Sequence, residues 1–248
     1  MDVALYLQRI GYSGSIKPDL DTLRSLHAAH SLSVPFENLD IHRGVPIVLE
    51  KEALYRKIVL KRRGGYCYEL NLLFYFLLRE IGFDVEIYRG CLFSDDETLI
   101  PSSVHLLLGV KIKERWIADV GVGNGGYLFP EPLDSSHQQS GYRFFPRENG
   151  YVLQDPICNG LWRNHYFFVP RPEGSLAVFE ERNRYHQTSH ESVMKRKRIC
   201  SKPTLFGSVD LIDRVLTVSE SGQTVKRELV KDSDYVLALE RYFGIRID

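Results

Sequence analysis

The sequence lacks several features that mark specialised classes of protein. Lys plus Arg and Asp plus Glu are equal, at 32 each among 248 residues, so no net charge favours binding to nucleic acid or to an anionic membrane. No apolar run reaches the roughly 20 residues that span a bilayer, and the first residues lack the basic start and the cleavage site of a signal peptide. We therefore expect a cytoplasmic protein that binds neither nucleic acid nor membranes.

Cysteine is also scarce. The four cysteines stand at positions 67, 91, 158 and 200, and no two of them form a C-x-x-C pair. This spacing is not that of a small disulfide scaffold, and it favours reduced thiols. Cys91, Cys158 and Cys200 have no setting that suggests chemistry, and we interpret them as structural. Cys67 has a different setting.

What the sequence does contain is a change of pattern along the chain. Up to about residue 83, apolar residues recur at helical spacing, and the last helix of this part, which Gly82 ends, is apolar on almost every face and so is expected to be central and buried. From Asp84 onward, short β-rich runs alternate with Gly, Pro and Asn. After about residue 190 come a hairpin around "ESGQ" and a final helix capped by Asp232 or Ser233. We predict an α+β protein in three parts, at 1–83, 84–192 and 193–248.

The segment "RRGGYCYELN", residues 62–71, places two glycines before the cysteine that opens the central helix. A cysteine in the first turn of a helix lies at the positive end of the helix dipole, which favours the thiolate. Gly64 and Gly65 would leave room for an acyl group to approach the sulfur. The alternative is a buried structural cysteine, which is the commoner role of this residue type. The setting nevertheless makes Cys67 a candidate nucleophile.

A nucleophilic cysteine needs a base, and the segment that follows supplies one. His105 begins an apolar run and Asp119 ends the next, on either side of a turn near residues 113–115. The carboxylate would orient the imidazole, which would take the thiol proton. A simple tight turn places Asp119 opposite a residue about three past His105. We therefore expect a bulge, a strong twist or a longer loop to bring the two side chains together.

Two other motifs do not support the function that their pattern suggests. "GVGNGG", residues 121–126, has the dinucleotide-binding pattern, but Pro130 and Pro132 exclude the helix that must follow it. His186 and His190 in "HQTSH" are four residues apart, without the Glu of a zinc-binding helix and in a segment that we interpret as a strand. We therefore expect no metal site.

Taken together, the motifs resemble those of the arylamine N-acetyltransferases. "RGGYCYELN" is similar to the nucleophile motif of that family, and "VPFENLDIH", "HLLLGV", "WIADVGVG" and "RNRYHQTSHESVMKRKR" follow in the family's order and spacing. The resemblance extends from about residue 5 to the C-terminus. It implies an N-terminal helical bundle, a central β-barrel and a C-terminal α/β lid, around a catalytic core like that of the cysteine proteases.

The resemblance also implies an activity. This is ping-pong transfer of an acetyl group from acetyl-CoA, through an acetyl-cysteine, to arylamines, arylhydroxylamines or hydrazines, with Cys67, His105 and Asp119 as the catalytic triad and no metal. Two other hypotheses stay open: a cysteine amidase or peptidase that uses the same triad with water as acceptor, and an inactive binding protein with the same fold. The sequence leaves the physiological acceptor and the oligomeric state open.

Five further residues are implied around the triad. The resemblance places the acceptor pocket at Phe36 and at Val122, where many members of the family carry Phe. Each of these two side chains has the alternative of being an ordinary core residue. Coenzyme A is expected at Ser102, Ser103 and Gly123.

A supporting cluster of charges is implied as well. Glu37 and Arg63 are expected to form an ion pair that holds the nucleophile loop. Asp40, which stands where many members of the family carry Asn, is expected to join Arg63. We interpret the basic run "MKRKR", residues 194–198, as a solvated edge strand, with contact to the phosphates of coenzyme A as the less favoured alternative.

Overall fold

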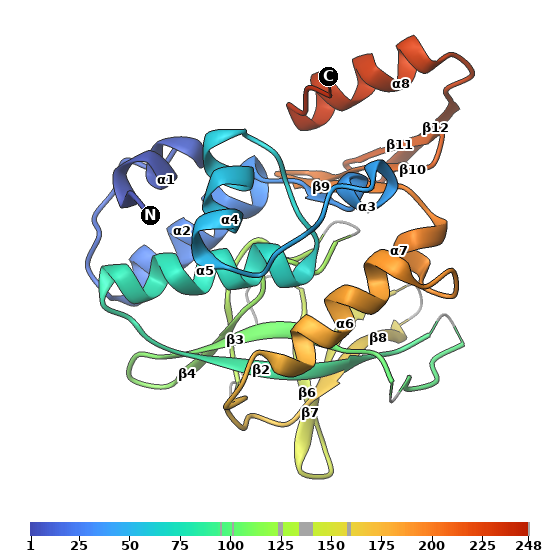
Figure 1. The fold of residues 1–248 in the computed structure, drawn as a ribbon. Coiled ribbons are helices and arrows are strands. Elements are labelled where there is room, and N and C mark those ends of the chain that lie inside the picture. Colours follow the sequence, from blue (N-terminus) through green and yellow to red (C-terminus); the bar gives the residue numbers. More distant parts are fainter. Residues whose placement is uncertain (95, 101, 124–125, 134–140, 158–159, 248) are drawn as a thin grey trace.

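The computed structural model describes residues 1–247 except 95, 101, 124–125, 134–140 and 158–159. Helices dominate the first third of the chain, a curled antiparallel sheet follows, and a smaller sheet with a final helix lies beside α3 (Figure 1). Within the described residues, no helix combines the length and the apolar character needed to cross a bilayer.

The described residues form the following elements. The helices are α1 (Val3–Arg9), α2 (Leu20–Ser33), α3 (Leu39–Arg43), α4 (Lys51–Tyr55), α5 (Cys67–Ile81), α6 (Ala177–Thr188), α7 (Val193–Arg196) and α8 (Asp232–Ala238), with π-helical turns η1 (Arg56–Leu60) and η3 (Leu239–Phe243). The strands are β1 (Phe36–Glu37), β2 (Asp84–Leu92), β3 (His105–Lys111), β4 (Arg115–Ala118), β5 (Glu131–Pro132), β6 (Arg143–Arg147), β7 (Gly150–Pro156), β8 (Trp162–Phe168), β9 (Ile199–Thr204), β10 (Gly207–Ile212), β11 (Val215–Glu220) and β12 (Gln223–Glu228).

Helix α5 is the central element, as its apolar sequence predicts. It lies across β2 and β3, with the other N-terminal helices on its opposite side (Figure 1). Its first eight residues, from Cys67 to Phe74, are all buried. Gly82 ends the helix in the left-handed conformation, at φ 101°, which favours glycine over any residue with a Cβ. The start of α5 is therefore held between the helices and the sheet.

Seven antiparallel strands form the curled sheet, in the order β5-β4-β3-β2-β8-β7-β6. Its strand β3 is buried on both faces, because Leu106 and Leu108 pack in the core that α5 shares, whereas Leu107 packs in a second core on the other face. A register shift at Leu153 and Gln154 interrupts the ladder between β7 and β8. The sheet curls into a nearly closed barrel, which confirms the predicted helical, barrel and α/β arrangement (Figure 1).

A second antiparallel sheet completes the fold, in the order β1-β9-β10-β11-β12, and it has an apolar core of its own with α8. The predicted hairpin is present, and Gly222 in its turn has φ 81°. Strand β1, however, comes from the N-terminal helical part. Its Phe36 pairs with Ser201 of β9, and its Glu37 pairs with Cys200. The division of the chain after residues 83 and 192 stays a prediction.

The expected cap of the last helix is wrong. Helix α8 begins at Asp232, so Lys231 occupies the capping position with an extended backbone and no capping hydrogen bond from its side chain. Asp232 instead lies in the first turn, where the helix dipole favours a carboxylate, and it forms an ion pair with Arg214. Ser233 lies one residue further inside the helix.

The strand expected around His186 is also wrong, because this residue lies in α6 and His190 follows the helix. Contacts with α5 account for the difference. The Tyr66 hydroxyl donates a hydrogen bond to Asn183 at 2.5 Å, and Phe179 packs edge-on against Tyr68. These tertiary contacts on one side of α6 outweigh the modest strand preference of its sequence.

The basic run 194–198 is not an edge strand either. It ends α7 and leads into β9, which lies between β1 and β10 inside the second sheet. The side chain of Asn38 holds this segment by donating hydrogen bonds to the carbonyls of Met194, at 2.8 Å, and Lys197, at 2.7 Å. It also accepts the Ile199 N–H. The run is therefore fixed against the N-terminal part of the chain.

Candidate active site

The candidate nucleophile, Cys67, is the first residue of α5 and is 8% exposed. Glu69, in the same first turn, accepts the N–H of Tyr66 at 3.2 Å, which fixes the turn that precedes the cysteine. Because α5 runs for 15 residues, the partial positive charge at its N-terminus favours negative charge on the sulfur.

The two glycines before Cys67 have a different role from the one that their sequence suggested. A Cβ on Gly64 would lie 2.0 Å from the Pro35 carbonyl oxygen, and a Cβ on Gly65 would lie 2.7 Å from the Cβ of Glu69. Both positions are buried. The glycines therefore allow the nucleophile loop to pack closely against its neighbours, rather than opening space for an acyl group.

A cluster of buried charges holds the same loop. Arg63 contacts Glu37 at 2.8 Å and Asp40 at 3.0 Å, which confirms the expected ion pair and its second acid. Lys57 extends the cluster, because its Nζ lies 2.7 Å from Glu69 and 3.2 Å from Asp40. This cluster, which we call the charge cluster, joins three carboxylates and two cations behind Cys67.

The pKa values within the charge cluster reflect both burial and pairing. Burial lowers the pKa of Lys57, but the charges of Glu69, Glu37 and Asp40 outweigh this and raise it above its ordinary value. For Asp40, burial raises the pKa, and the charges of Lys57 and Arg63 together bring it below its usual range. Burial raises the pKa of Glu69 to about 7, although Lys57 acts to lower it. The cluster therefore pairs its two cations with carboxylates, and Glu69 is the member that titrates near neutral pH.

His105 and Asp119 form the second half of the candidate site. His105 Nε2 lies 2.6 Å from Asp119 Oδ2, and both side chains are buried. Cys67 also interacts with the imidazole, since it is among the groups that raise the pKa of His105. Burial would lower the pKa of His105, but the charge and hydrogen bond of Asp119, joined by the interaction with Cys67, raise it to about 10. Cysteine, imidazole and carboxylate are thus in series.

Of the three devices expected between His105 and Asp119, neither a bulge nor a longer loop is present. The ladder of β3 and β4 is regular, and it pairs Leu108 with Ala118 next to the site. Continuing this register places Asp119 opposite Leu107, two residues from His105 and on the same face. Diagonal neighbours on one face of a sheet are close enough for long side chains to meet, so a tight hairpin suffices.

Asp119 is fixed by several hydrogen bonds besides that of His105. Its Oδ1 accepts from the Asn71 side chain at 2.8 Å and from the Gly121 N–H at 3.0 Å. Its own N–H donates to His27 Nε2 at 3.1 Å. Burial raises the pKa of Asp119, but His105 and these donors lower it below its usual value. The carboxylate therefore stays ionised in the interior.

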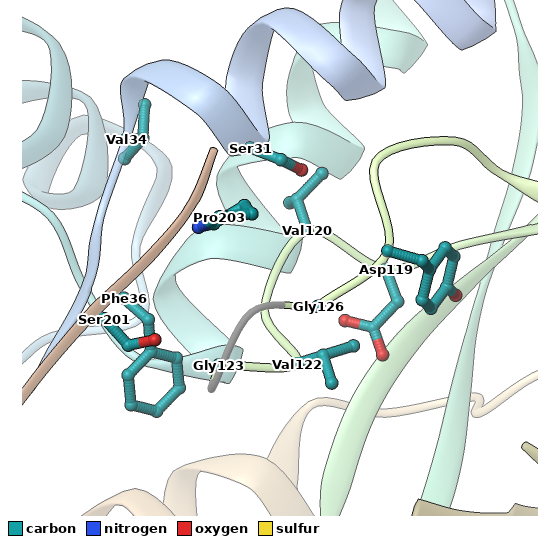
Figure 2. Close-up of a pocket in the computed structure, with 11 residues that line it drawn as sticks. Ser31, Val34, Phe36, Asp119, Val120, Val122, Gly123, Gly126, Ser201 and Pro203 are labelled. Atoms are coloured by element: carbon teal, nitrogen blue, oxygen red, sulfur yellow. The ribbon is translucent and has the colours of Figure 1, made fainter. Parts of the chain in front are cut away.

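A small pocket opens beside Asp119. Figure 2 shows the Phe36 ring and the Val122 side chain on either side of the Gly123 backbone, below α2. Gly123 has φ 70°, and a Cβ there would lie 3.4 Å from the Phe36 ring. The pocket holds about 290 Å³ of empty space, open solvent at its mouth included, and it is lined by Ser31, Val34, Phe36, Asp119, Val120, Val122, Gly123, Gly126, Tyr127, Ser201 and Pro203. Three of the residues implied for the acceptor and coenzyme A thus lie together.

Known proteins of one family are similar to this chain in sequence and in fold. A model of the N-acetyltransferase family matches residues 19–248. An arylamine N-acetyltransferase of Gallus gallus, the liver isozyme, is 32% identical over 236 residues, which cover 86% of this chain and 82% of that protein. The chain belongs to the arylamine N-acetyltransferase family. The relative from Mycolicibacterium smegmatis is 42% identical over 145 residues, or 56% of this chain.

The extent of these matches differs between relatives. The chain spans about half the length of the first curated relatives that it matches, 53% of the Mycolicibacterium smegmatis protein and 48% of the Escherichia coli protein. Solved structures match more completely. The arylamine N-acetyltransferase of Mycobacterium marinum is 31% identical, with a TM-score of 0.91 over 98% of this chain and 93% of that one. A complex of the same protein with CoA has 32% identity and a TM-score of 0.90, over 98% and 93%.

Two other residues implied for coenzyme A by the family resemblance lie elsewhere. Ser102 is exposed in the turn before β3. Ser103 accepts the Leu92 N–H at 2.6 Å and donates to the Ile100 carbonyl at 2.7 Å, so its hydroxyl already holds the loop together. Neither lines the pocket beside Asp119. Their role in binding coenzyme A stays a prediction.

Three further expectations from the sequence concern the glycine motif at residues 121–126, the other cysteines and metal binding. The residues after Gly126 form bends and β5, not the helix of a dinucleotide site. Cys91 and Cys200 carry free thiols, and burial raises the pKa of both, whereas Cys158 lies outside the described residues. Across the described part of the chain, no group of three His, Cys, Asp or Glu side chains is placed to hold a metal ion.

Several residues of the site are not among those that the sequence predicts. Asn71 carried a usable signal, because it lies four residues after Cys67 and so on the same face of α5. Lys57 lies in a helical segment with several other basic residues, and nothing in that segment separates it from them. His27 and Tyr166 come from amphipathic or β-rich segments in which an aromatic residue is ordinarily interpreted as core.

Proposed function

We propose that this protein transfers an acetyl group from acetyl-CoA to arylamines, arylhydroxylamines or hydrazines, through an acetyl-Cys67 intermediate. The observation that carries the proposal is the buried pair of His105 and Asp119, which interacts with Cys67 at the start of α5 in a chain of this family. The relative from Mycobacterium marinum with the same fold was solved in complex with CoA, which supports CoA as the carrier of the acyl group.

The first half-reaction follows from the protonation of the pair. Because the pKa of His105 is raised to about 10, the imidazole holds a proton at neutral pH, and the neighbouring sulfur can carry the negative charge. The sulfur attacks the thioester carbonyl of acetyl-CoA, and the bond from the carbonyl carbon to the CoA sulfur breaks. His105 gives its proton to the departing CoA thiolate. Acetyl-Cys67 and neutral His105 remain.

The second half-reaction restores the enzyme. The nitrogen of an arylamine attacks the carbonyl carbon of acetyl-Cys67, and neutral His105 takes one proton from that nitrogen. The bond to the Cys67 sulfur then breaks, which leaves the acetylated amine and the original charged pair. Asp119 holds its negative charge throughout and stabilises the imidazolium each time it forms.

The pocket beside Asp119 is proposed to hold the acceptor. Its apolar side chains Phe36 and Val122 suit a flat aromatic ring, and a ring placed there would lie next to the triad. We propose that the backbone at Gly123 admits the arm of coenzyme A, and that Ser102 and Ser103 contact the cofactor. We also propose a reducing, cytoplasmic setting, since the described cysteines are free thiols.

Intact-protein mass measurement with acetyl-CoA and no acceptor tests the proposal. One acetyl group is expected on Cys67, and the Cys67→Ala variant is expected to show neither the adduct nor turnover. Cys91→Ala, which removes a second free cysteine, is the control and is expected to behave as wild type. An adduct that persists in Cys67→Ala, or that maps to Cys91, would contradict the assignment.

Adding an acceptor separates transfer from hydrolysis. For an acetyltransferase, CoA release should depend on aniline or a hydrazine and should match the acetylated product mole for mole. A hydrolase that uses the same three residues would release CoA at the same rate without an amine. Equal rates with and without amine would therefore favour the amidase or peptidase hypothesis over acetyl transfer.

A further inference from the structure

One imidazole ring joins the two ends of the segment that carries the triad aspartate. We call the described residues of this segment, 119–123 and 126–128, the aspartate loop. His27 of α2 accepts the N–H of Asp119 at Nε2, at 3.1 Å, and its Nδ1 lies 2.9 Å from the Leu128 carbonyl oxygen. Since Nε2 accepts a hydrogen bond, the proton is on Nδ1, and the ring is neutral.

The same face of α2 also forms one wall of the acceptor pocket. Ser31 and Val34, one and two turns beyond His27, line the pocket together with residues of the aspartate loop (Figure 2). The His27 ring stacks on Tyr127, with centroids 5.6 Å apart, and meets Phe74 of α5 edge-on at 6.0 Å. His27 is fully buried. The ring therefore has one position, set by three neighbouring elements.

We propose that His27 is a positioning residue for acetyl transfer: it fixes the aspartate loop to α2, and so sets both the orientation of Asp119 and the width of the acceptor pocket. This inference rests on the function proposed above. Asn71 and Gly121 hold the Asp119 carboxylate, but His27 receives the main-chain N–H that precedes it. The N–H of the next residue, Val120, is held separately, because it donates to Asn71 Oδ1 at 2.9 Å, so the bond to His27 is the one that fixes the backbone N–H of Asp119 itself.

The neutral state of His27 is part of this arrangement. Burial lowers the pKa of His27 to about 4, and the hydrogen bond to Leu128 and the charge of Asp119 oppose only part of that effect. The titratable groups that face the ring are Asp119 and Tyr127 from the loop and His30 from α2. A protonated ring would present N–H groups on both sides and could no longer accept the Asp119 N–H.

Two substitutions at this position separate the hydrogen bonds from the ring. In His27→Gln, the carboxamide can accept from Asp119 and donate to Leu128, but the stacking ring is lost. In His27→Phe, the ring volume and the stacking remain, but both backbone groups lose their partner. His30→Phe is the matched control, because His30 is an equally buried histidine of α2 that bonds to Tyr6 instead of the aspartate loop.

The first measurement is single-turnover acetylation of Cys67, at a temperature where circular dichroism shows every variant to be folded. We expect acetylation of His27→Phe to be slowed by roughly 100-fold, the effect of misplacing a reacting group by about 1 Å. In steady-state assays with an amine, the same variant should also have a raised KM for the acceptor. His27→Gln should recover most of that loss, and His30→Phe should lose stability without this change in rate. Equal rates for His27→Phe and His30→Phe would overturn the proposal.

The second measurement is the pH profile of Cys67 alkylation by iodoacetamide, which a merely structural role of His27 would not move. We expect the profile of His27→Phe to shift, since a displaced Asp119 no longer holds the charge on His105, while His27→Gln follows wild type near neutral pH. As the pH falls toward 4, wild type should lose reactivity faster than His27→Gln, which has no ring to protonate. Superimposable acid limbs would overturn the proposal, even if His27→Phe does not fold.

The two levels of hypothesis fail separately. Turnover that persists in Cys67→Ala would refute the assignment of the catalytic triad, whatever the His27 variants do. Turnover that requires Cys67, but survives unchanged in His27→Phe, would leave the proposed function standing and remove only the positioning role.

Discussion

The two halves of the candidate site are supported by different kinds of interaction. Behind Cys67, the charge cluster consists of paired ions, such as Lys57 with Glu69 and Arg63 with Glu37. Around Asp119, the supports are neutral donors and acceptors, among them Asn71 and His27. His105 is the group whose charge lowers the pKa of Asp119.

This difference follows from what each half must do. The nucleophile loop needs a fixed backbone, and ions placed behind it can supply this without touching the reacting sulfur. In the proposed mechanism Asp119 keeps its full negative charge for His105, so a cationic support would compete with the imidazole and an anionic one would raise the pKa of the carboxyl. Neutral supports fix the position of Asp119 without changing the charge that its carboxylate presents to His105.

The largest expected effect on activity comes from removing the negative charge of Asp119. Asp119→Asn keeps the shape of the side chain, so we expect an intact fold with activity reduced roughly 10⁴-fold, as for triad carboxylates elsewhere. Steady-state kinetics and thermal melting measure the two quantities. Asp40→Asn is the control, since it neutralises a buried carboxylate of the charge cluster. Near-normal turnover of Asp119→Asn would mean that another acid orients His105.

Next in size is the loss of one ion from the charge cluster. Glu37→Gln leaves Arg63 buried with Asp40 as its remaining partner, and breaking a buried pair in this way costs about 3–5 kcal/mol of the free energy of unfolding. Urea denaturation measures this cost. Glu80→Gln, which removes the exposed pair between Lys51 and Glu80, should change stability little. If the two variants lose the same stability, the cluster does not hold the nucleophile loop.

A third prediction uses pH to distinguish the two histidines beside Asp119. The pKa of His27 is lowered to about 4, below the value near 6.5 of an unfolded chain. Its neutral form therefore contributes to the free energy of unfolding above pH 6.5, and this contribution is lost as the pH falls toward 4. That loss amounts to about 3 kcal/mol. The pKa of His105 is raised to about 10, so its contribution is present below pH 6.5 and is lost as pH rises toward 10.

Urea unfolding across this range should resolve the two contributions. We expect His27→Gln to flatten the acid side of the stability profile and His105→Gln to flatten the alkaline side. Burial also lowers the pKa of His30 and His186, so some acid sensitivity should remain in His27→Gln. A variant that alters the opposite side of the profile would contradict the charge states assigned to His27 and His105.

The smallest effect on activity is expected from a substitution that adds an uncharged, larger side chain to the pocket. Val122→Phe should restore a ring–ring contact for small unsubstituted arylamines and improve their kcat/KM by the equivalent of about 0.5–1.5 kcal/mol, while it impairs bulky acceptors. The acetyl-CoA half-reaction should change little. If Val122 is instead an ordinary packing residue, Phe would destabilise the fold by roughly 1–3 kcal/mol and impair every acceptor equally. Thermal melting together with kinetics on both classes of acceptor decides between these outcomes.

Much of this site could be predicted from the sequence because its signals are local. The setting of Cys67 at a helix start, and the run from His105 to Asp119, depend on short segments whose elements are easily recognised. The pair of Glu37 and Arg63 followed from the family resemblance. Each of these residues lies in a motif whose spacing carries information.

What could not be predicted depends on contacts between distant segments. The role of Gly64 is set by the Pro35 carbonyl, which no pattern around the glycine reveals. His27 bonds to a loop about 100 positions away, and its neighbours in the sequence are those of any amphipathic helix. The sequence predicts a strand where helix α6 lies, because this helix buries little beyond Phe179 and Asn183 and so shows almost no helical periodicity.

The short strand β1 has a consequence for the order in which the molecule is completed. Phe36 of this strand forms a bridge with Gly65 of the nucleophile loop and also pairs with Ser201 of β9, across a long stretch of intervening chain. Contacts of such sequence separation form slowly, because closing a long loop costs chain entropy before any contact is gained. During synthesis, the pocket beside Asp119 therefore stays unfinished until the residues of β9 have left the ribosome, and the proposed activity would be among the last properties that the folding chain acquires.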